Sequence, residues 1–218
     1  MLDPIIVQIL LGIGFIFYPL NILYVFISKQ LKLKRKTIKT TVHKESEKHR
    51  KVNKIAIIGI LALDIFILIT VFNIFFFNII VDSIPRIKVF FLTESVQIMG
   101  FFFLLLGGLV LFISYRELGE NWTAPVQTDY KLHLEKEHLL VQTGIYKFIR
   151  HPIYDAMYII VIGVNFLILD WLTLFVSIIG VIGLYYQAIE EEKSLIDEFG
   201  EMYINYMKNT GRILPKIL

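Results

Sequence analysis

Long apolar runs separated by short polar segments make up most of this chain. Several runs reach the roughly 20 residues that a helix needs to cross the hydrocarbon core of a bilayer. The last two are shorter, with Asp170 between them, and this pattern predicts a helical hairpin over residues 153–189. Because open strands cannot satisfy their backbone in lipid, every run is expected to be a helix. The predicted spans are Pro4–Ile27, Ile55–Val81, Val89–Tyr115, Ile153–Leu169 and Trp171–Ile189.

Composition agrees with an integral membrane protein. Hydrophobic residues make up 56% of the 218 positions, and the mean hydropathy is +0.66, which is too apolar for an ordinary soluble domain of this size. The chain has no cysteine, so it has no disulfide, thiolate metal site or cysteine nucleophile. Residues 1–27 lack a basic leading segment and continue into a Lys-rich stretch, which favours a retained helix over a cleaved signal peptide. The predicted fold class is therefore an all-α membrane protein with about five transmembrane helices.

Positive charge is concentrated between the first two spans. Ser28–Lys54 holds 11 of the 22 Lys and Arg residues, and short loops of this kind stay in the cytoplasm. The loop can also contact anionic lipid headgroups, and its membrane anchors at both ends argue against a nucleic-acid partner. Counting crossings from this loop places the turn "DSIPRIK" outside. It places Arg116–Pro152 and Glu190–Leu218 in the cytoplasm, where any active site is expected.

Polar residues inside the apolar runs are interpreted as interhelical hydrogen-bonding positions. Asp64 is the most costly of them unless it faces protein or water. The glycines in "GIG" at 12–14 and the pair Gly107-Gly108 are interpreted as helix-packing positions. The other polar residues in the runs are Asn73, Asn78, Glu94, Gln97 and Asn165.

Common soluble-enzyme fingerprints are absent from the sequence, including GxGxxG after a strand, a Walker loop and HExxH. The histidines do not have the spacing of metal ligands, so no metal site is predicted. They are His43, His49, His133, His138 and His151.

The stretch "EHLLVQTGIYKFIRHPIY" at residues 137–154 combines basic groups with the start of the fourth predicted helix. His138, Arg150 and His151 can donate hydrogen bonds to a carboxylate or phosphate, and Gly144 permits a tight turn. Pro152 suits a first helical turn, whose free N–H groups favour an anionic ligand. The alternative is a basic anchor at the membrane surface, with Tyr146 and Tyr154 as interfacial aromatics. The residues alone do not decide between these two readings.

A second polar stretch, "QAIEEEKSLIDEFGEMYINYM" at residues 187–207, follows the hairpin. Gln187 and Glu191 share a helix face that Leu195 and Phe199 continue, and this face is expected to point inward. At least one glutamate should therefore be partly buried, and a buried carboxylate needs a cationic or hydrogen-bonding partner. His138, Arg150 and His151 are the candidates on the same side of the membrane.

These stretches, in this order around a hydrophobic hairpin, resemble the isoprenylcysteine carboxyl methyltransferase family, in particular its small prokaryotic members. The shared motifs are "RHPIY" at 150–154, "EEKSL" at 191–195, "FG" at 199–200 and "RILP" at 212–215. The segments "LVQTGIY" and "LGENWTA" are similar as well. The resemblance implies three N-terminal helices in residues 1–115 and a catalytic core in residues 116–218.

The resemblance also implies a reaction. S-adenosylmethionine would bind in a cytosol-facing pocket, leaving S-adenosylhomocysteine as product, and a lipophilic or lipidated acceptor would enter between helices from the bilayer. Alignment of sulfur, methyl group and acceptor would supply much of the rate. Glu191 would position the acceptor, with Gln187 as the second catalytic position. The implied cofactor contacts are His138, Leu140, Val141, Gly144, Tyr146, His151, Tyr154 and Glu192.

This sequence departs from the family pattern in three places. Ala156 replaces a common Gly, and the segment between Trp122 and His138 is long. Gln187 occupies the position where methyltransferases that act on prenylcysteine carry an Arg. The acceptor therefore stays open between a prenylcysteine carboxylate, a phospholipid amine and a small thiol.

Two other functions fit the same fold. Membrane sterol and steroid reductases look similar at the C-terminal end and use NADPH, but the acidic stretch Glu190–Glu201 is a poor match for the extra phosphate. A non-catalytic membrane protein of the same fold is the other alternative.

Overall fold

The computed structural model describes residues 1–16, 54–88, 92–119 and 140–216. Regular structure within these ranges is helical, apart from two isolated β-bridges. The elements are an N-terminal helix over Pro4–Ile16, α2 (Lys54–Ile80), α3 (Thr93–Leu118), the 3-10 turn η3 (Gly144–Lys147), α5 (Pro152–Ile168), α6 (Trp171–Phe199) and α7 (Glu201–Asn209).

Three of the described helices, α2, α3 and α6, are long and apolar enough to cross a membrane, which confirms the all-α membrane class. The helix Pro4–Ile16 and α5 are apolar but shorter. The predicted first span is helical as far as Ile16, and its remainder lies outside the described residues, as does most of the basic loop Ser28–Lys54. The five crossings and the side on which the C-terminal region lies stay predictions.

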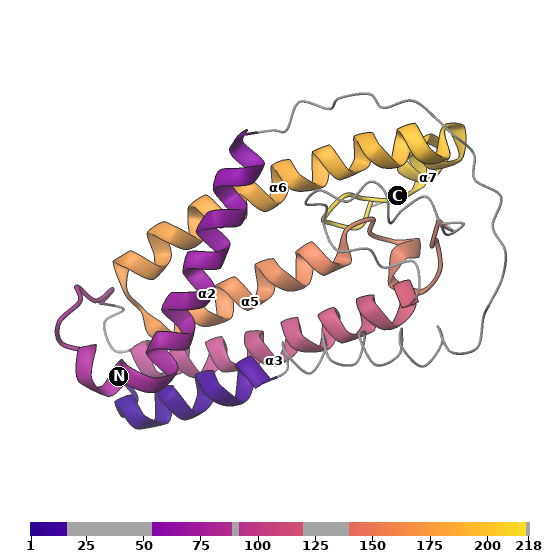
Figure 1. Cartoon of the computed structure of the whole chain (residues 1–218). Helices are drawn as coiled ribbons and strands as arrows, with labels where there is room; N and C mark the ends of the chain where they lie inside the picture. Colours follow the sequence, from indigo (N-terminus) through magenta and orange to yellow (C-terminus); the bar gives the residue numbers. More distant parts are fainter. Residues whose placement is uncertain (17–53, 89–91, 120–139, 217–218) are drawn as a thin grey trace, which may run out of the picture.

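The helices pack in two pairs, α3 along α5 and α2 across α6 (Figure 1). Glycine lets both pairs approach closely. A Cβ atom added to Gly59 of α2 would lie 2.0 Å from the Cα atom of Gly183 in α6, so the two backbones touch. A Cβ atom on Gly100 of α3 would lie 2.8 Å from the carbonyl oxygen of Gly163 in α5. Small residues allow such contacts in membranes, where the gain comes from close packing rather than from burial away from water.

The glycines that the sequence assigned to packing also lie in tight contacts. A Cβ atom on Gly14 would meet the side chain of Leu104 at 2.6 Å, and one on Gly107 would meet Ile160 at 2.6 Å. The interpretation of these glycines as packing positions is confirmed. Gly12 is looser, with its nearest neighbour at 3.7 Å.

The predicted hairpin is present, and its turn is short. Asp170 caps α6 by accepting hydrogen bonds from the backbone N–H and the hydroxyl of Thr173, at 2.6 and 2.9 Å. Arg86, after α2, donates to the carbonyl oxygen of Ile168 at 2.8 Å and lies 3.9 Å from Asp170. The α5–α6 turn is therefore fastened to the end of α2.

Polar residues inside the helices behave in two ways. Gln97 of α3 donates to the carbonyl oxygen of Leu167 at 3.0 Å, and Asn165 of α5 donates to the hydroxyl of Ser177 at 3.0 Å. These are the predicted interhelical bonds. Asn73 instead bonds within its own helix, and Asp64 is exposed on α2.

Helix α6 is longer than its apolar span, which was predicted to end at Ile189. It continues through all three adjacent glutamates to Phe199, as the helix face predicted through Glu191, Leu195 and Phe199 requires. Glutamate and lysine are good helix formers, so a helix can continue through them beyond the end of its apolar segment. Gly200, with φ +55°, then turns the chain back into α7.

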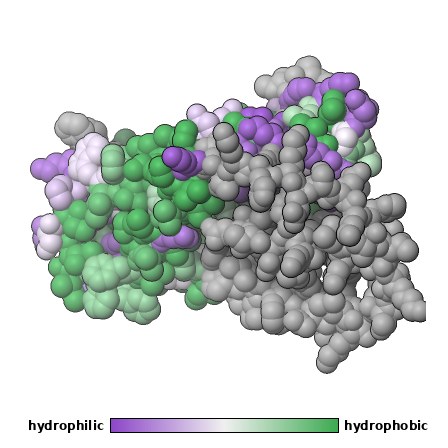
Figure 2. All heavy atoms as spheres, turned by 45° about the horizontal axis from the view of Figure 1, so that its top comes forward, coloured by the Kyte–Doolittle hydropathy of each residue, from purple (hydrophilic) through white to green (hydrophobic). Residues whose placement is uncertain are grey.

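Hydrophobic residues cover most of the described surface on the left of Figure 2, and hydrophilic residues gather at its upper right, toward the end that holds the last turns of α6 and α7. The polar end also contains the start of α5, so the motifs at residues 150–154 and 191–195 lie together (Figure 1).

We expect the turn after α2 to face the outside and the end of α6 to face the cytoplasm. The reason is the Lys and Arg excess of Ser28–Lys54, which keeps that loop inside. Because the chain has no cysteine, a single Cys at Ser83 or at Glu198, both exposed, can be labelled cleanly with a membrane-impermeant thiol reagent. Ser83→Cys should react from outside and Glu198→Cys only from the cytoplasmic side. Labelling of Ser83→Cys from the cytoplasmic side would refute this topology.

Candidate functional site

Backbone hydrogen bonds join the start of α5 to the C-terminal segment. His151 is the N-cap residue of α5 and Pro152 is its first residue, as the sequence predicted. The backbone N–H groups of Arg150 and His151 donate to the carbonyl oxygens of Gly211 and Arg212, at 2.9 and 3.1 Å. This short pairing brings the "RHPIY" and "RILP" motifs together.

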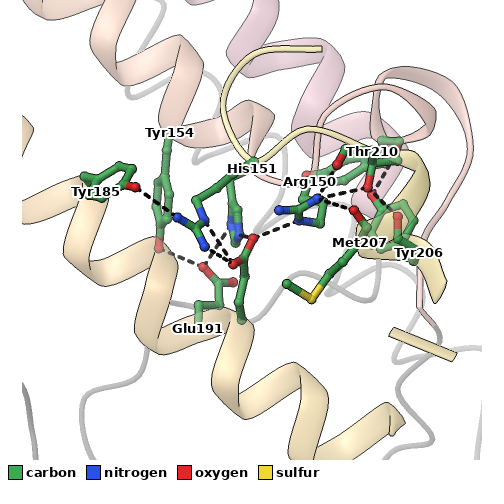
Figure 3. Close-up of polar contacts among 11 residues, drawn as sticks. Arg150, His151, Tyr154, Tyr185, Glu191, Tyr206, Met207 and Thr210 are labelled. Atoms are coloured by element: carbon green, nitrogen blue, oxygen red, sulfur yellow. Dashed lines mark hydrogen bonds and ion pairs between the residues drawn. The ribbon is translucent and has the colours of Figure 1, made fainter. Parts of the chain in front are cut away.

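Glu192 lies at the centre of a buried ionic cluster. Figure 3 shows this part of the molecule, with Arg150, His151 and Glu191 labelled. Its side chain is 3% exposed, and its Oε1 atom accepts a hydrogen bond from Nε of Arg150 at 2.8 Å. Its Oε2 atom accepts bonds from Nε and Nη2 of Arg212, at 2.9 and 2.6 Å. Nε2 of His151 lies 3.4 Å from Oε1. One carboxylate therefore holds three basic side chains from two segments of the chain.

Arg150 extends this cluster to α7. Its Nη1 atom donates to the carbonyl oxygens of Met207, at 3.2 Å, and Thr210. Because Arg150 makes all these contacts with the protein and its side chain is only 7% exposed, its role here is structural.

Glu191 is the more accessible of the two carboxylates. Its Oε2 atom accepts a hydrogen bond from the hydroxyl of Tyr154 at 2.9 Å and lies 3.5 Å from Nδ1 of His151. The rings of His151 and Tyr154 are stacked, with their centroids 5.4 Å apart, which fixes both donors. The Glu191 side chain is 43% exposed, and its Oε1 atom has no recorded partner among the described residues. It is held in place from one side and open on the other.

The two carboxylates favour a charged His151. Burial by itself lowers the pKa of an imidazole, but the contacts with Glu191 and Glu192 outweigh it, so the pKa of His151 lies above its ordinary value. The cluster then carries three cations against two carboxylates, a balance that suits an added anionic group.

Tyr146 forms the wall of the site beside α3. Its carbonyl oxygen accepts a hydrogen bond from the hydroxyl of Tyr206 at 2.6 Å, and its own hydroxyl lies 3.5 Å from the carbonyl oxygen of Ser114. Burial, reinforced by the charge of Glu191, raises the pKa of Tyr146 well above its usual range, so the phenol stays a donor.

Gly144 makes the tight turn that the sequence predicted, with φ +56°. The group that approaches it is the side chain of Glu117, since a Cβ atom on Gly144 would lie 2.4 Å from the carboxyl carbon. Any larger residue would therefore be strained and would displace Glu117.

The remaining predicted residues are placed as follows. Leu140 and Val141 are half-buried in the segment before η3, and Gln187 is half-buried on α6, one turn before Glu191. His138 lies outside the described residues.

The predicted inward face of α6 was shifted by one residue. We expected Gln187, Glu191, Leu195 and Phe199 to face inward, but the buried face runs through Leu184, Ala188 and Glu192. Spacing alone cannot choose between neighbouring faces of a helix whose apolar residues surround it, and the glycine contacts with α2 decide the rotation. The expectation that a glutamate is buried and paired with Arg150 and His151 is confirmed.

The sequence motifs predicted no role for Arg212, Tyr185 and Thr210. Arg212 bonds Glu192 and, through Nη1, the hydroxyl of Tyr185 at 3.1 Å, and Thr210 accepts from Arg150 at 3.3 Å (Figure 3). The signal that could have identified Arg212 is the R-x-x-P motif close to the end of the chain, because a buried carboxylate needs cations from elsewhere.

An apolar groove of about 440 Å³ adjoins the cluster on the outer side of α5 and α6. Ile162, Ile182 and Tyr185 in its walls are 41–49% exposed, so it opens sideways onto the apolar surface of the helices. Tyr185 and the chain next to Arg212 link the groove to the ionic cluster. The lining residues are Tyr158, Ile162, Val181, Ile182, Tyr185 and Ile213.

The region that contains most of the cluster matches the sequence model of a known protein family. The sequence model of the isoprenylcysteine carboxyl methyltransferase (ICMT) family matches residues 98–197. This part of the chain is similar to that family. The match contains α5, η3, both glutamates of the cluster and most of α3 and α6, and the resemblance inferred from the motifs is confirmed.

Individual relatives agree with the family. The chain is 31% identical over 137 residues to the protein-S-isoprenylcysteine O-methyltransferase of Saccharomyces cerevisiae, covering 61% of this chain and 56% of that protein. It is 29% identical to the enzyme of the same name from Dictyostelium discoideum, covering 61% and 53%. The methanethiol S-methyltransferase of Pseudomonas deceptionensis is 34% identical over 80 residues, which is 34% of this chain and 27% of that protein. The chain matches only about half the length of the first two relatives.

Replacing Glu192 with Gln should destabilise the protein, because the change leaves buried cations without their carboxylate. Removing one partner of a buried ion pair costs about 3–5 kcal/mol. For a chain of this size each kcal/mol lowers the thermal midpoint by about 2–4 °C, so we expect a fall of roughly 6–20 °C in detergent. Glu198→Gln, an exposed change on the same helix, is the control and should leave the midpoint within about 2 °C. Equal midpoints for the two variants would show that the cluster does not stabilise the fold.

Proposed function

We propose that this protein is an integral membrane methyltransferase that uses S-adenosylmethionine and transfers a methyl group to a lipophilic acceptor. The observation that carries the proposal is the cluster in which the "RHPIY", "EEKSL" and "RILP" motifs meet, within and beside the region that matches the ICMT family.

The polar groups of the site fit such a cofactor. S-adenosylmethionine carries an amino group, a carboxylate and a sulfonium-bound methyl group, which is the group it supplies when bound. The cluster offers a half-exposed carboxylate at Glu191 and an excess of basic groups around it. Nε2 of His151 and the hydroxyl of Tyr203 are buried without a hydrogen-bond partner among the described residues. Buried polar atoms in this state are costly unless something completes them.

Each residue of the site has a separate role in this proposal. Glu192 holds Arg150, His151 and Arg212 in position, and it is retained as a cofactor contact because the family resemblance implies it. His151 and Tyr154 orient Glu191, which is free to bind an amino group or position the acceptor. Tyr146, whose hydroxyl donates to the carbonyl oxygen of Ser114, is retained as a cofactor contact because the family resemblance implies it. We retain Leu140, Val141, Gly144 and His138 as cofactor contacts because the family resemblance implies them.

The apolar groove is the proposed entry for the acceptor. It opens sideways on the membrane-facing surface and ends near Arg212, so an apolar chain can stay in lipid while its head approaches the cluster. Holding donor and acceptor in line is a large part of catalysis when no covalent enzyme intermediate forms. In this proposal the active site faces the cytoplasm, and residues 116–218 form the catalytic core.

Ligand binding tests the proposal against the reductase alternative. Detergent-solubilised protein should bind S-adenosylhomocysteine and not NADPH, as measured by titration calorimetry. His151→Ala and Tyr146→Ala should each weaken S-adenosylhomocysteine binding about ten- to a hundredfold, the value of a hydrogen bond to a charged group. Lys193→Ala, an exposed change on α6, is the control and should bind like wild type. NADPH binding would favour the reductase, and binding of neither ligand would favour a non-catalytic protein.

Gln187 leads to a prediction about the acceptor. A prenylcysteine carboxylate in a poorly hydrated site needs a cation, and an Arg side chain matches a carboxylate with two parallel hydrogen bonds. The neutral amide of Gln187 cannot balance that charge, and Glu191, one turn on, adds repulsion. Wild type should therefore methylate a farnesylcysteine analogue poorly compared with amine or thiol acceptors, and Gln187→Arg should raise turnover of the analogue. Robust turnover by wild type with no gain in Gln187→Arg would contradict this expectation.

A further inference from the structure

Asp155 is a buried carboxylate that the ionic cluster does not use. It lies in the first turn of α5, and neither of its side-chain oxygens has solvent contact or a hydrogen-bond partner among the described residues. The charge of His151 acts on it, but that imidazole already faces Glu191 and Glu192. The positive end of α5 offsets only part of the cost of burying such a group. Within the described ranges, Asp155 therefore lacks a dedicated partner.

The same face of α5 continues into the apolar groove. Asp155, Tyr158 and Ile162 are spaced three and four residues apart, so they follow one another along one side of the helix. Tyr158 and Ile162 line the groove. The hydroxyl of Tyr158 is also buried without a hydrogen-bond partner in the described part of the chain. Tyr158 thus marks one end of the apolar lining, and Asp155, whose charge acts on Tyr158, lies one turn beyond that end, behind the groove wall.

A carboxylate near the end of an apolar groove favours ligands whose head group is positively charged. A carboxylate head would be repelled by Asp155 and would bring a second uncompensated charge into a dry site. An ammonium head group would pair with Asp155 through a charge-assisted hydrogen bond and could also donate to the hydroxyl oxygen of Tyr158. The alkyl chain of the same ligand would fill the groove.

We propose that Asp155 and Tyr158 form a head-group site that gives the groove a preference for long-chain amines over long-chain carboxylates. Asp155 is then a specificity-determining residue. The inference rests on the proposed function only in treating the groove as the path of the acceptor, and the binding preference itself does not require methyl transfer.

Photolabelling at the groove tests the preference directly. The probes are a dodecylamine and a dodecanoic acid that carry the same diazirine in the alkyl chain, added to protein in a neutral detergent, with labelled residues mapped by mass spectrometry. In wild type the amine should label Ile162, Ile182 and their neighbours about tenfold more than the acid, as expected for one charge-assisted hydrogen bond. Asp155→Asn should reduce that ratio to within about twofold. The matched control Asp197→Asn removes an exposed carboxylate from α6 and should keep the wild-type ratio.

The thermal midpoint of Asp155→Asn is a second measurement. It shows whether Asp155 serves ligand binding or supports the fold. If Asp155 is unpartnered, Asp155→Asn removes a buried charge, and the thermal midpoint without ligand should stay equal or rise. A clear fall would show that Asp155 supports the fold and would overturn the inference. So would equal labelling by both probes in wild type, or an amine preference that survives in Asp155→Asn.

Binding of S-adenosylhomocysteine, measured on the same samples, keeps the two proposals apart. Absence of the amine preference in wild type, with intact S-adenosylhomocysteine binding, would refute only the head-group site. An amine preference without S-adenosylhomocysteine binding would refute the methyltransferase proposal and leave the head-group site standing.

Discussion

The geometry of the polar end depends on the carboxylate of Glu192. A single buried side chain accepts from Arg150 before α5 and from Arg212 near the C-terminus, with His151 close by. Segments that lie far apart in the sequence are thus tied to α6 at one point. The ionic contacts satisfy the buried charges, and the backbone pairing beside Gly211 keeps the basic side chains in register. The neighbouring Glu191 can remain half-exposed because Glu192 already anchors the surrounding cations.

Close helix packing provides the frame on which that cluster is built. Contacts through Gly59 and Gly183 set the rotation of α6 against α2, and those through Gly100 and Gly163 set α5 against α3. A rotation of α6 by one residue would expose Glu192 and bury Glu191 in its place. Backbone contact in the apolar region therefore decides which of two adjacent carboxylates becomes the structural centre and which stays accessible.

The site also joins two environments with different physical demands. The ionic cluster is compact and largely satisfied, whereas the adjoining groove is apolar and opens to the surface that α5 and α6 present to lipid. An enzyme that joins a charged, water-soluble donor to a lipophilic acceptor requires both, placed side by side. In the proposals made above, Gln187 and Asp155 are the residues that set the preference of this chain for its acceptor.

Much of this protein could be predicted from its sequence alone. Apolar run lengths predicted α2, α3 and the α5–α6 hairpin, because crossing lipid requires long stretches without charge. Ordered motifs predicted the family, and the need to pair a buried carboxylate predicted that Arg150 and His151 would meet a glutamate. The predicted buried face of α6 was wrong by one residue, since spacing does not distinguish adjacent faces of an apolar helix. Only the tertiary structure showed that Arg212 completes the cluster, that Glu192 is more buried than Glu191, and that Asp155 has no hydrogen-bond partner in the part of the chain that the structure describes. These facts depend on contacts between segments far apart in the chain.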